Sequence, residues 1–389
     1  MLRFIYKFKF LVYFFIIFLN IFILSERVLA TPTITNVSGD LTDNNSITIS
    51  GTDFGISGPT IKVFDDFESG EADSFIGNGT VTPAVIGNWE PCDDCYPYLS
   101  SYSNNFAKSG TKSSRQNWTT DMQGGGRLMI LKWIIPVTEI YFSFWTYLPS
   151  GMSTPDGDFN SPNWKVWWLN PIHYGESDPR NFDSDYASEI ITNPPADTSF
   201  CWVDDLDGQD RACANYSSFN FSNGQWQRFE GHLIGSDSSS GSGELWLTNA
   251  SSSRVLHASI SGKTLNTSNG IMGWIEMHFP GYARADTTTN TYYDDIYVAT
   301  GVGAQARIEI GNASTYSNCT NLSIVTPTAW ADTSITATIR QGSFSPGQQA
   351  YLYVVDSNGV ANTNGYPIII GENGMDISAP EAPSGLLIF

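Results

Sequence analysis

The sequence of 389 residues predicts an all-β protein made of two β-sandwiches, and two observations support this class. No window of about a dozen residues keeps its apolar side chains at the 3.6-residue period of an amphipathic helix. Short runs that alternate apolar and polar residues are instead separated by turns rich in Gly, Ser, Thr and Asn. Such runs at close spacing are typical of antiparallel sandwiches and barrels.

The start of the chain predicts a secretory signal peptide in residues 1–30. Three basic residues lie among the first nine, an apolar run follows over residues 10–24, and Val28-Leu29-Ala30 fits a small-residue cleavage site. The apolar run, about fifteen residues long, is short for a membrane span. We therefore expect a secreted or cell-surface protein without membrane contact after cleavage, and an uncleaved anchor is the alternative.

The chain is acidic, with 39 Asp and Glu against 19 Lys and Arg, a formal charge of −20. Nucleic-acid binding requires clustered basic residues, so nucleic acid is not an expected partner. The five cysteines fit an oxidising compartment. We expect Cys201 and Cys213 to close a loop, and Cys92 and Cys95 to form a small strained bridge or half of a metal or redox motif. Cys319 would stay unpaired.

Two separated segments carry a related strand pattern. Near the start, the strands ITNVSG and ITISG precede an FG loop, and near the end W-x-D-T-S-I-T precedes YLYVVDSNG. These segments resemble the first and the later strands of an immunoglobulin-like TIG (IPT) domain. We therefore expect residues 32–63 and 304–371 to form one discontinuous immunoglobulin-like sandwich, followed by a tail in residues 372–389. Two unrelated fragments, or a separate C-terminal sandwich, are the alternatives.

The region between these segments, residues 64–303, would be an inserted domain, which is tolerated where the inserted ends lie close together. It begins with FDDFESG and ends with YYDDIYVATG, and it contains EIYFSFWTYLPSG and NGQWQRFEGHLIG. These strands resemble those of a concanavalin A-like (laminin G-like) jelly roll, in which the first and last strands pair. The resemblance implies a jelly-roll β-sandwich as the larger domain.

The stretch WIEMHFPGYAR, residues 274–284, combines an alternating strand pattern with chemically active side chains. Its three odd-numbered apolar residues are expected to face the opposite sheet. The other face would present an indole, a carboxylate and an imidazole, from Trp274, Glu276 and His278. The Pro280-Gly281 pair marks a bend or bulge, so Tyr282 and Arg284 share that face only if the register continues past it.

A second candidate strand lies in SPNWKVWWLNPIHY, residues 161–174. Aromatic rings stack on the apolar faces of sugars, and neighbouring polar groups bind the hydroxyls. The stretch therefore predicts a sugar-binding platform from Asn163, Lys165, Trp167 and His173. Packing of the tryptophans in the core is the alternative.

Jelly rolls of the concanavalin A-like type include polysaccharide lyases, so the resemblance implies lyase activity as one function. β-Elimination requires a group that neutralises the uronate carboxylate, a base for the C5 proton and an acid for the leaving oxygen. The resemblance implies these catalytic roles for His278, Tyr282 and Arg284, with substrate contacts from Trp274, Glu276 and the platform above. No lyase motif matches residue by residue. Hydrolase chemistry is disfavoured, because no E-x-D-x-x-E string occurs.

Two acidic clusters favour calcium as a cofactor. The stretch DDLDGQD offers hard oxygen ligands beside a glycine, although the last Glu of an EF-hand is missing; its carboxylates are Asp204, Asp205, Asp207 and Asp210. A second cluster would form if the terminal strands of the jelly roll pair, from Asp65, Asp66, Asp294 and Asp295. Like charges there would repel unless a cation or hydrogen bonds offset them.

These features together predict a secreted protein that engages an extended extracellular polysaccharide in a jelly-roll groove. If it is an enzyme, a lyase is favoured over a glycoside hydrolase. A non-catalytic carbohydrate-binding module and a structural or adhesive surface protein are the alternatives, because one fold supports all three functions.

Overall fold

The protein is described by a computed structural model, and every strand discussed below belongs to the unit Pro32–Phe389. The described residues are 30–91, 100–118, 129–150, 164–171, 186–190, 199–204, 212–215, 223–280, 282–283 and 289–372. Within them, the helical segments are two 3₁₀ turns, η2 (Thr267–Asn269) and η3 (Tyr316–Asn318), which confirms the predicted all-β class. None of these residues forms a helix long and apolar enough to cross a membrane. Nearly all of the predicted signal peptide lies outside them.

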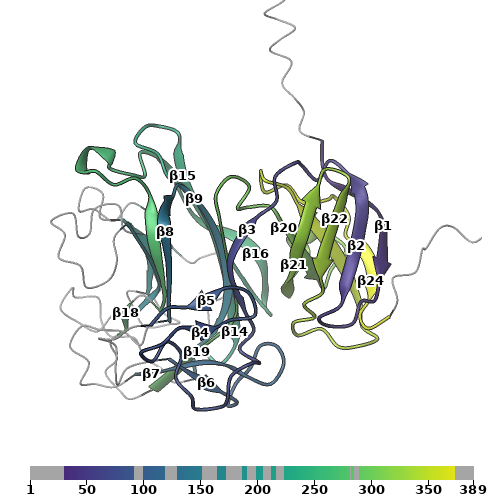
Figure 1. The fold of residues 1–389 in the computed structure, drawn as a ribbon, viewed down its shortest axis with the longest axis horizontal. Coiled ribbons are helices and arrows are strands. Elements are labelled where there is room, and N and C mark those ends of the chain that lie inside the picture. The colour runs from purple at the N-terminus through teal and green to yellow at the C-terminus, as the bar shows by residue number, and fades with distance from the viewer. Residues whose placement is uncertain are drawn as a thin grey trace, which may run out of the picture. The chain divides into compact units, whose positions relative to one another are not determined.

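One antiparallel sheet has eight strands and is called the large sheet (Figure 1). Its strands are, in order, β16 (Ser252–Gly262), β15 (Gly241–Asn249), β14 (Trp226–Ile234), β9 (Glu139–Tyr147), β19 (Thr289–Thr300), β7 (Ser113–Trp118) and β6 (Ser101–Ser103). β3 (Thr60–Asp65) also pairs with β19. The first and last strands of the predicted jelly roll therefore lie side by side, as the resemblance implied.

A further antiparallel sheet of the jelly roll is called the second sheet. Its strands are, in order, β13 (Ala212–Asn215), β12 (Ser199–Asp204), β11 (Tyr186–Ile190), β10 (Trp164–Asn170), β17 (Trp274–Phe279) and β8 (Met129–Val137). The short strand β18 (Tyr282–Ala283) pairs with β10 beyond the end of β17. A separate two-stranded ladder joins β4 (Thr82–Pro83) to β5 (Asn88–Trp89).

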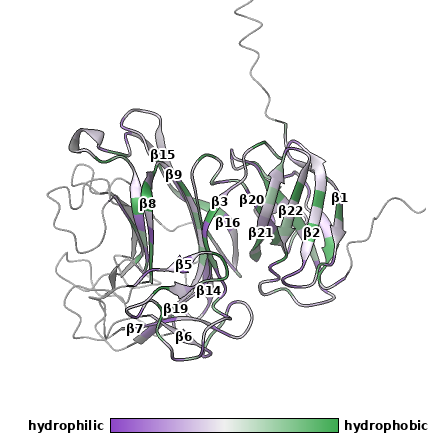
Figure 2. Ribbon diagram, viewed as in Figure 1, coloured by the Kyte–Doolittle hydropathy of each residue, from purple (hydrophilic) through white to green (hydrophobic). Residues whose placement is uncertain are grey.

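The jelly-roll core lies between the large sheet and the second sheet. Phe144 and Phe229 of the large sheet stack with their ring centroids 5.4 Å apart, and Phe279 of β17 meets Phe144 edge-on at 5.2 Å. Tyr293 of β19 donates its hydroxyl to the carbonyl oxygen of Val166 on β10 at 2.9 Å. Figure 2 shows hydrophobic segments along the strands of both sheets. Burial of these apolar faces provides the main driving force for packing the two sheets together.

The C-terminal sheet combines the start of the described chain with its end. Its strands are, in order, β1 (Thr33–Gly39), β2 (Ser46–Thr52), β22 (Ser334–Thr338), β21 (Leu322–Ala331), β20 (Arg307–Gly311), β23 (Gln349–Val355) and β24 (Tyr366–Ile369). β2 pairs with β22, and Ile49 and Phe54 share one apolar cluster with Ile308 and Val325. β3 already belongs to the large sheet from Thr60 onward. The TIG assignment and the exact domain bounds stay predictions.

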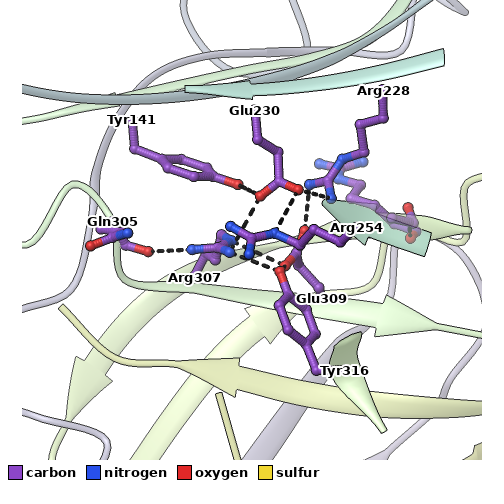
Figure 3. Close-up of polar contacts among 10 residues, drawn as sticks. Tyr141, Arg228, Glu230, Arg254, Gln305, Arg307, Glu309 and Tyr316 are labelled. Atoms are coloured by element: carbon purple, nitrogen blue, oxygen red, sulfur yellow. Dashed lines mark hydrogen bonds and ion pairs between the residues drawn. The ribbon is translucent and has the colours of Figure 1, made fainter. Parts of the chain in front are cut away.

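A buried network of charges joins the large sheet to the C-terminal sheet (Figure 3). On β14, the Nη1 of Arg228 lies 3.0 Å from the Oε2 of Glu230. On β20, the Nε of Arg307 lies 3.0 Å from the Oε2 of Glu309. Arg228 also binds Glu309, and the Nη2 of Arg307 lies 3.4 Å from Glu230, so the two strands are cross-linked in both directions. Arg254 of β16 completes the network through its Nε at 3.0 Å from Glu230.

Candidate functional site

The polar face of the second sheet is built by two rows of side chains across β10, β17 and β8. In one row, Trp168, His278 and Ile130 are ladder partners; in the next row, the partners are Asn170, Glu276 and Lys132. The row between them consists of Leu169, Met277 and Leu131, which all belong to the jelly-roll core. Because side chains alternate along a strand, the two polar rows lie on the face that points away from this core. We call it the outer face.

His278 and Glu276 form a hydrogen bond between Nε2 and Oε1 on this face. The other carboxylate oxygen of Glu276 lies 3.7 Å from the Nζ of Lys132. Glu276 and His278 are 0% exposed, whereas the side chain of Lys132 is 32% exposed. The buried carboxylate thus lies between an imidazole and an ammonium group, an arrangement that offsets the cost of burying its charge. The prediction that Glu276 and His278 share one face agrees with this geometry.

Asn170 adds a buried amide beside this pair. It is the ladder partner of Glu276 and is 6% exposed. In the part of the chain that the structure describes, its Oδ1 has no hydrogen-bond partner. Buried polar atoms are nearly always hydrogen-bonded, and an unpaired one costs about 1–3 kcal/mol. An acceptor of this kind beside a carboxylate and an imidazole is typical of a ligand-binding position.

Trp274 does not lie on the outer face as predicted, because β17 pairs with an irregular partner. The ladder passes from Trp274 opposite Val137 to Glu276 opposite Lys132, so four residues of β8 face a single residue of β17. This bulge breaks the period of two, since a shift of one residue exchanges the faces. Trp274 is fully buried in the jelly-roll core, and its carbonyl oxygen accepts a hydrogen bond from the indole of Trp133.

Trp167 is likewise a core residue, and its predicted role in a sugar platform is wrong. It is fully buried, and its ring centroid lies 4.6 Å from that of Phe142. The ladder between β10 and β11 shifts register between Lys165 and Trp167. Trp168, which was not predicted, lies on the outer face instead, with its ring centroid 6.5 Å from the imidazole of His278.

The remaining predicted residues are described in part or not at all. In the backbone ladder, Lys165 on β10 lies opposite Tyr282 on β18 and opposite Glu189 on β11. Asp204 is the last residue of β12. The other predicted positions lie outside the described residues: Asn163, His173, Asp205, Asp207, Asp210 and Arg284. The roles of all these residues stay predictions.

The second acidic cluster is held by hydrogen bonds. Asp65 accepts one from the indole of Trp89 at 2.6 Å and one from the backbone amide of Phe67 at 3.0 Å. Asp294 accepts the amides of Lys108 and Ser109 at 2.7 and 3.1 Å. Among the described residues, no group of three or more acidic, His or Cys side chains is arranged to hold a metal ion. Of the two arrangements that could offset the repulsion here, a cation or hydrogen bonds, the described residues show the hydrogen bonds.

Burial changes the ionisation of this cluster. Desolvation raises the pKa of Asp65 to about 7, despite the two hydrogen bonds that favour its charged form. Desolvation and the neighbouring Asp295 raise the pKa of Asp294 well above its usual value. The carboxyls of this cluster thus retain protons at a pH at which exposed carboxyls are ionised, which lessens their mutual repulsion.

No protein-family model matches the chain, and no curated protein matches it in sequence. Among solved structures, the chain is similar to the alginate lyase Aly36B, with 11% identity, 62% of this chain and 97% of that chain covered, and a TM-score of 0.40. It is similar to an endo-β-1,4-glucuronan lyase from the fungus Trichoderma reesei, with 12% identity, coverages of 62% and 96%, and a TM-score of 0.39. It is also similar to the cellulose-induced protein Cip1, with 15% identity, coverages of 61% and 97%, and a TM-score of 0.36. At these identities the similarity concerns the fold alone, and the chemistry depends on this chain's own residues.

Proposed function

We propose that this protein acts outside the cell, where it holds a uronate-containing polysaccharide against the outer face of the second sheet and cleaves it by β-elimination. The observation that carries the proposal is the contact of Glu276 with both Lys132 and His278, together with the buried Oδ1 of Asn170, which has no partner among the described residues. This group of side chains combines a cation, a carboxylate-oriented imidazole and an amide, which are groups that the elimination of an acidic sugar requires.

His278 is proposed as the base for the C5 proton. A neutral imidazole that donates its Nε2 hydrogen to Glu276 has its proton-accepting position at Nδ1. Glu276 then stabilises the imidazolium that forms when the proton is taken, as the carboxylate does in a catalytic triad. In the reaction, the C5–H bond and the bond from C4 to the glycosidic oxygen break, and a C4–C5 double bond forms. The proton of C5 ends on His278.

Asn170 and Lys132 are proposed to bind the uronate. The carboxylate of the sugar gains charge as C5 loses its proton, so N–H donors directed at its oxygens stabilise the transition state more than the ground state. The amide of Asn170 supplies such donors, and its Oδ1 accepts a hydrogen bond from a sugar hydroxyl. The ammonium of Lys132 supplies the local positive charge that an acidic chain needs to bind an acidic polymer.

Two further catalytic roles complete the proposal. Tyr282, whose backbone lies opposite Lys165 in the ladder, is proposed as the acid that protonates the leaving oxygen. Arg284, which follows it in the sequence, is proposed as a second partner of the uronate carboxylate. Both residues belong to the stretch that begins with β17, so one segment of chain would supply the base, the acid and a carboxylate partner.

A non-catalytic carbohydrate-binding protein is the second candidate function. The observation that favours it is the complete burial of both Glu276 and His278, at 0% exposure. A buried pair of this kind can support a binding face by fixing the positions of its neighbours without taking part in chemistry. In that case the polysaccharide would contact the partly exposed side chain of Lys132 and would be released without being cleaved.

The two candidates are separated by one experiment with the full secreted chain. It is incubated with polymannuronate, polyguluronate, polygalacturonate and polyglucuronate, and the ultraviolet absorbance of unsaturated uronate ends is followed. The lyase proposal predicts that absorbance increases with at least one polymer. Binding in an affinity gel without any increase would support the non-catalytic candidate, and the absence of both would contradict the two proposals together.

A further inference from the structure

A cleft of about 680 Å³ lies on the large sheet, whereas the chemistry proposed above belongs to the second sheet. Two adjacent rows of side chains form its floor: His232, Glu244 and Ser259 in one row, and Glu139, Ile234, Ser242 and Ser261 in the next. Val302, Gly303, Gln305 and the turn at Ser357 and Asn358 line it from the C-terminal part of the chain. The volume is in the range of small-molecule sites.

The charge of the cleft is negative. Glu139 and Glu244 line it, and no Lys or Arg is among the described residues that do so. The Oε1 of Glu139 lies 3.3 Å from the Nε2 of His232. Glu244 is the ladder partner of His232 and forms no ion pair within the described residues. With no Lys or Arg among the described lining residues, these two carboxylates attract a cation and repel an anion, so the cleft does not suit a uronate chain.

Gln305 supplies an independent sign of a ligand. It is 6% exposed and lines the cleft. Its backbone carbonyl accepts a hydrogen bond from the Nη1 of Arg307 at 2.8 Å (Figure 3), but its side-chain amide makes none within the described residues. Since Gln305 lines the cleft, the carbonyl oxygen of this amide is an acceptor suited to an N–H donor inside it.

Part of the cleft lining is aliphatic. Val302 is 83% exposed and Ile234 is 36% exposed, while no aromatic ring that could stack on a sugar is among the described lining residues. Glu139 on β9 and Glu244 on β15 are two strands apart and offset by two residues. Standard strand geometry therefore separates their Cα atoms by roughly 12 Å.

The cleft thus offers two separated carboxylates, aliphatic side chains and an amide acceptor. These groups complement a ligand whose ammonium groups are spaced along a methylene chain. We propose that this cleft binds a linear aliphatic polyamine. One terminal ammonium pairs with Glu139 and the other with Glu244, the methylenes lie on Ile234 and Val302, and a nitrogen donates to Gln305. This function is separate from the polysaccharide site, and either can fail without the other.

The test is isothermal titration calorimetry of the full secreted chain at low ionic strength with spermidine as the probe. We expect one spermidine per chain, bound at least tenfold more tightly than butylamine, which has a single ammonium group, and no binding of the neutral polyol xylitol. The double substitution Glu139→Gln/Glu244→Gln should weaken spermidine binding at least tenfold. The matched control Glu71→Gln/Glu372→Gln removes the same charge at exposed positions and should leave binding unchanged.

Equal weakening in the control pair would overturn the proposal, because it would show general attraction to an acidic chain. Equal affinity for butylamine and spermidine, or no binding of spermidine, would overturn it as well. If the melting temperature of Glu139→Gln/Glu244→Gln differs from that of the parent chain, Gln305→Leu provides a second variant. It keeps all charges and should weaken spermidine binding while the control pair does not.

Discussion

Glu230 is fully buried on β14 and is held by hydrogen bonds from arginine and tyrosine side chains (Figure 3). Burial by itself would raise the pKa of this carboxyl, but three guanidinium groups lower it to about 2; they belong to Arg228, Arg254 and Arg307. Glu230 therefore stays ionised throughout the ordinary pH range. Since its charge balances buried cations from two sheets, it is the residue at which the network is most sensitive to substitution.

The substitution Glu230→Gln is expected to lower the free energy of unfolding by about 3–5 kcal/mol, because it leaves buried guanidinium groups without their counter-charge. Urea denaturation followed by circular dichroism measures this loss. The control is Asp73→Asn, which breaks the exposed ion pair with Arg115, where the Asp73 side chain is 76% exposed. That pair should contribute less than about 1 kcal/mol. A Glu230→Gln variant as stable as the control would contradict this account of the network.

At the scale of elements, β17 shows what a strand pattern can and cannot predict. The alternation of WIEMHF placed Glu276 and His278 on one face, and their ladder rows agree. Trp274 was misplaced because β8 inserts extra residues opposite β17, and Trp167 because β10 and β11 shift register. A bulge depends on the partner strand, which is distant in sequence, so one strand's own pattern does not reveal it.

Two site residues were not predicted from the sequence, and the reason is again that the partner strands were unknown. Lys132 is a single charged residue inside the apolar strand β8, and Asn170 ends the aromatic strand β10. Each is visible in the sequence as an unusual polar residue. Neither points to a site until β8 and β10 are known to flank β17, because it is the ladder that brings them beside Glu276.

The ladder between β12 and β13 places Cys201 opposite Cys213. Directly opposite residues of an antiparallel pair have Cα atoms about 4.5–5.5 Å apart, within the range that a disulfide spans. We predict that the protein carries a Cys201–Cys213 disulfide when it is produced in an oxidising compartment. Peptide mapping by mass spectrometry without reduction should recover the two cysteines in one linked pair. Alkylation of both without a reductant would contradict the prediction.

The free thiol of Cys319 provides an internal control for that measurement. It is buried, and desolvation raises the pKa of its thiol. Because the thiolate is the reactive form, Cys319 should be alkylated only after the protein is unfolded. Labelling of Cys319 in the folded protein would show that the sample is not intact, and the disulfide assignment would then be repeated.

For the whole molecule, the alternating runs and turn residues were sufficient to predict the all-β class, whereas the pairing of β3 with β19 was implied only by the resemblance to concanavalin A-like jelly rolls. The polar interior was not predictable in the same way. Asp294 is buried because backbone amides of Lys108 and Ser109 reach it from a segment more than 180 positions away. Sequence spacing gives no measure of such contacts, so the sequence left open whether a cation or hydrogen bonds would offset the repulsion between these carboxyls.

These buried carboxyls make the stability of the molecule depend on pH. Burial raises the pKa of Asp65 from 3.8 to about 7, and the pKa values of Asp66, Asp294 and Asp295 are also raised, mainly by burial. The folded state thus keeps protons that the unfolded state releases. The free energy of unfolding therefore falls as pH rises from 3.8 to about 7. It falls by about 1.4 kcal/mol per pH unit for each proton that the folded state binds and the unfolded state does not.

Two other groups act in the opposite direction at lower pH. The lowered pKa of Glu230 contributes stability that is lost as pH falls from 4.5 towards about 2. Burial lowers the pKa of His257 from 6.5 to about 4. Between pH 4 and pH 6.5 the unfolded state therefore binds a proton at this histidine that the folded state does not bind. This effect on stability is opposite in sign to that of the carboxyls and offsets the contribution of one of the four. We therefore predict a melting temperature that is higher near pH 5 than near pH 7.5, measured by differential scanning calorimetry. A melting temperature that rises over this interval would contradict the protonated state of the acidic cluster.

We propose that β-elimination on the outer face of the second sheet depends on His278 as the general base. The most direct test compares initial rates of unsaturated-uronate formation for His278→Ala and His257→Ala, since both histidines are buried in strands, one on each sheet of the jelly roll. Melting temperatures confirm that both variants are folded. We expect His278→Ala to lower the rate by about 10²–10⁴-fold, as removal of a general base does, and His257→Ala to keep the rate within about twofold of the parent. A folded His278→Ala variant that retains the parent rate would contradict the claim.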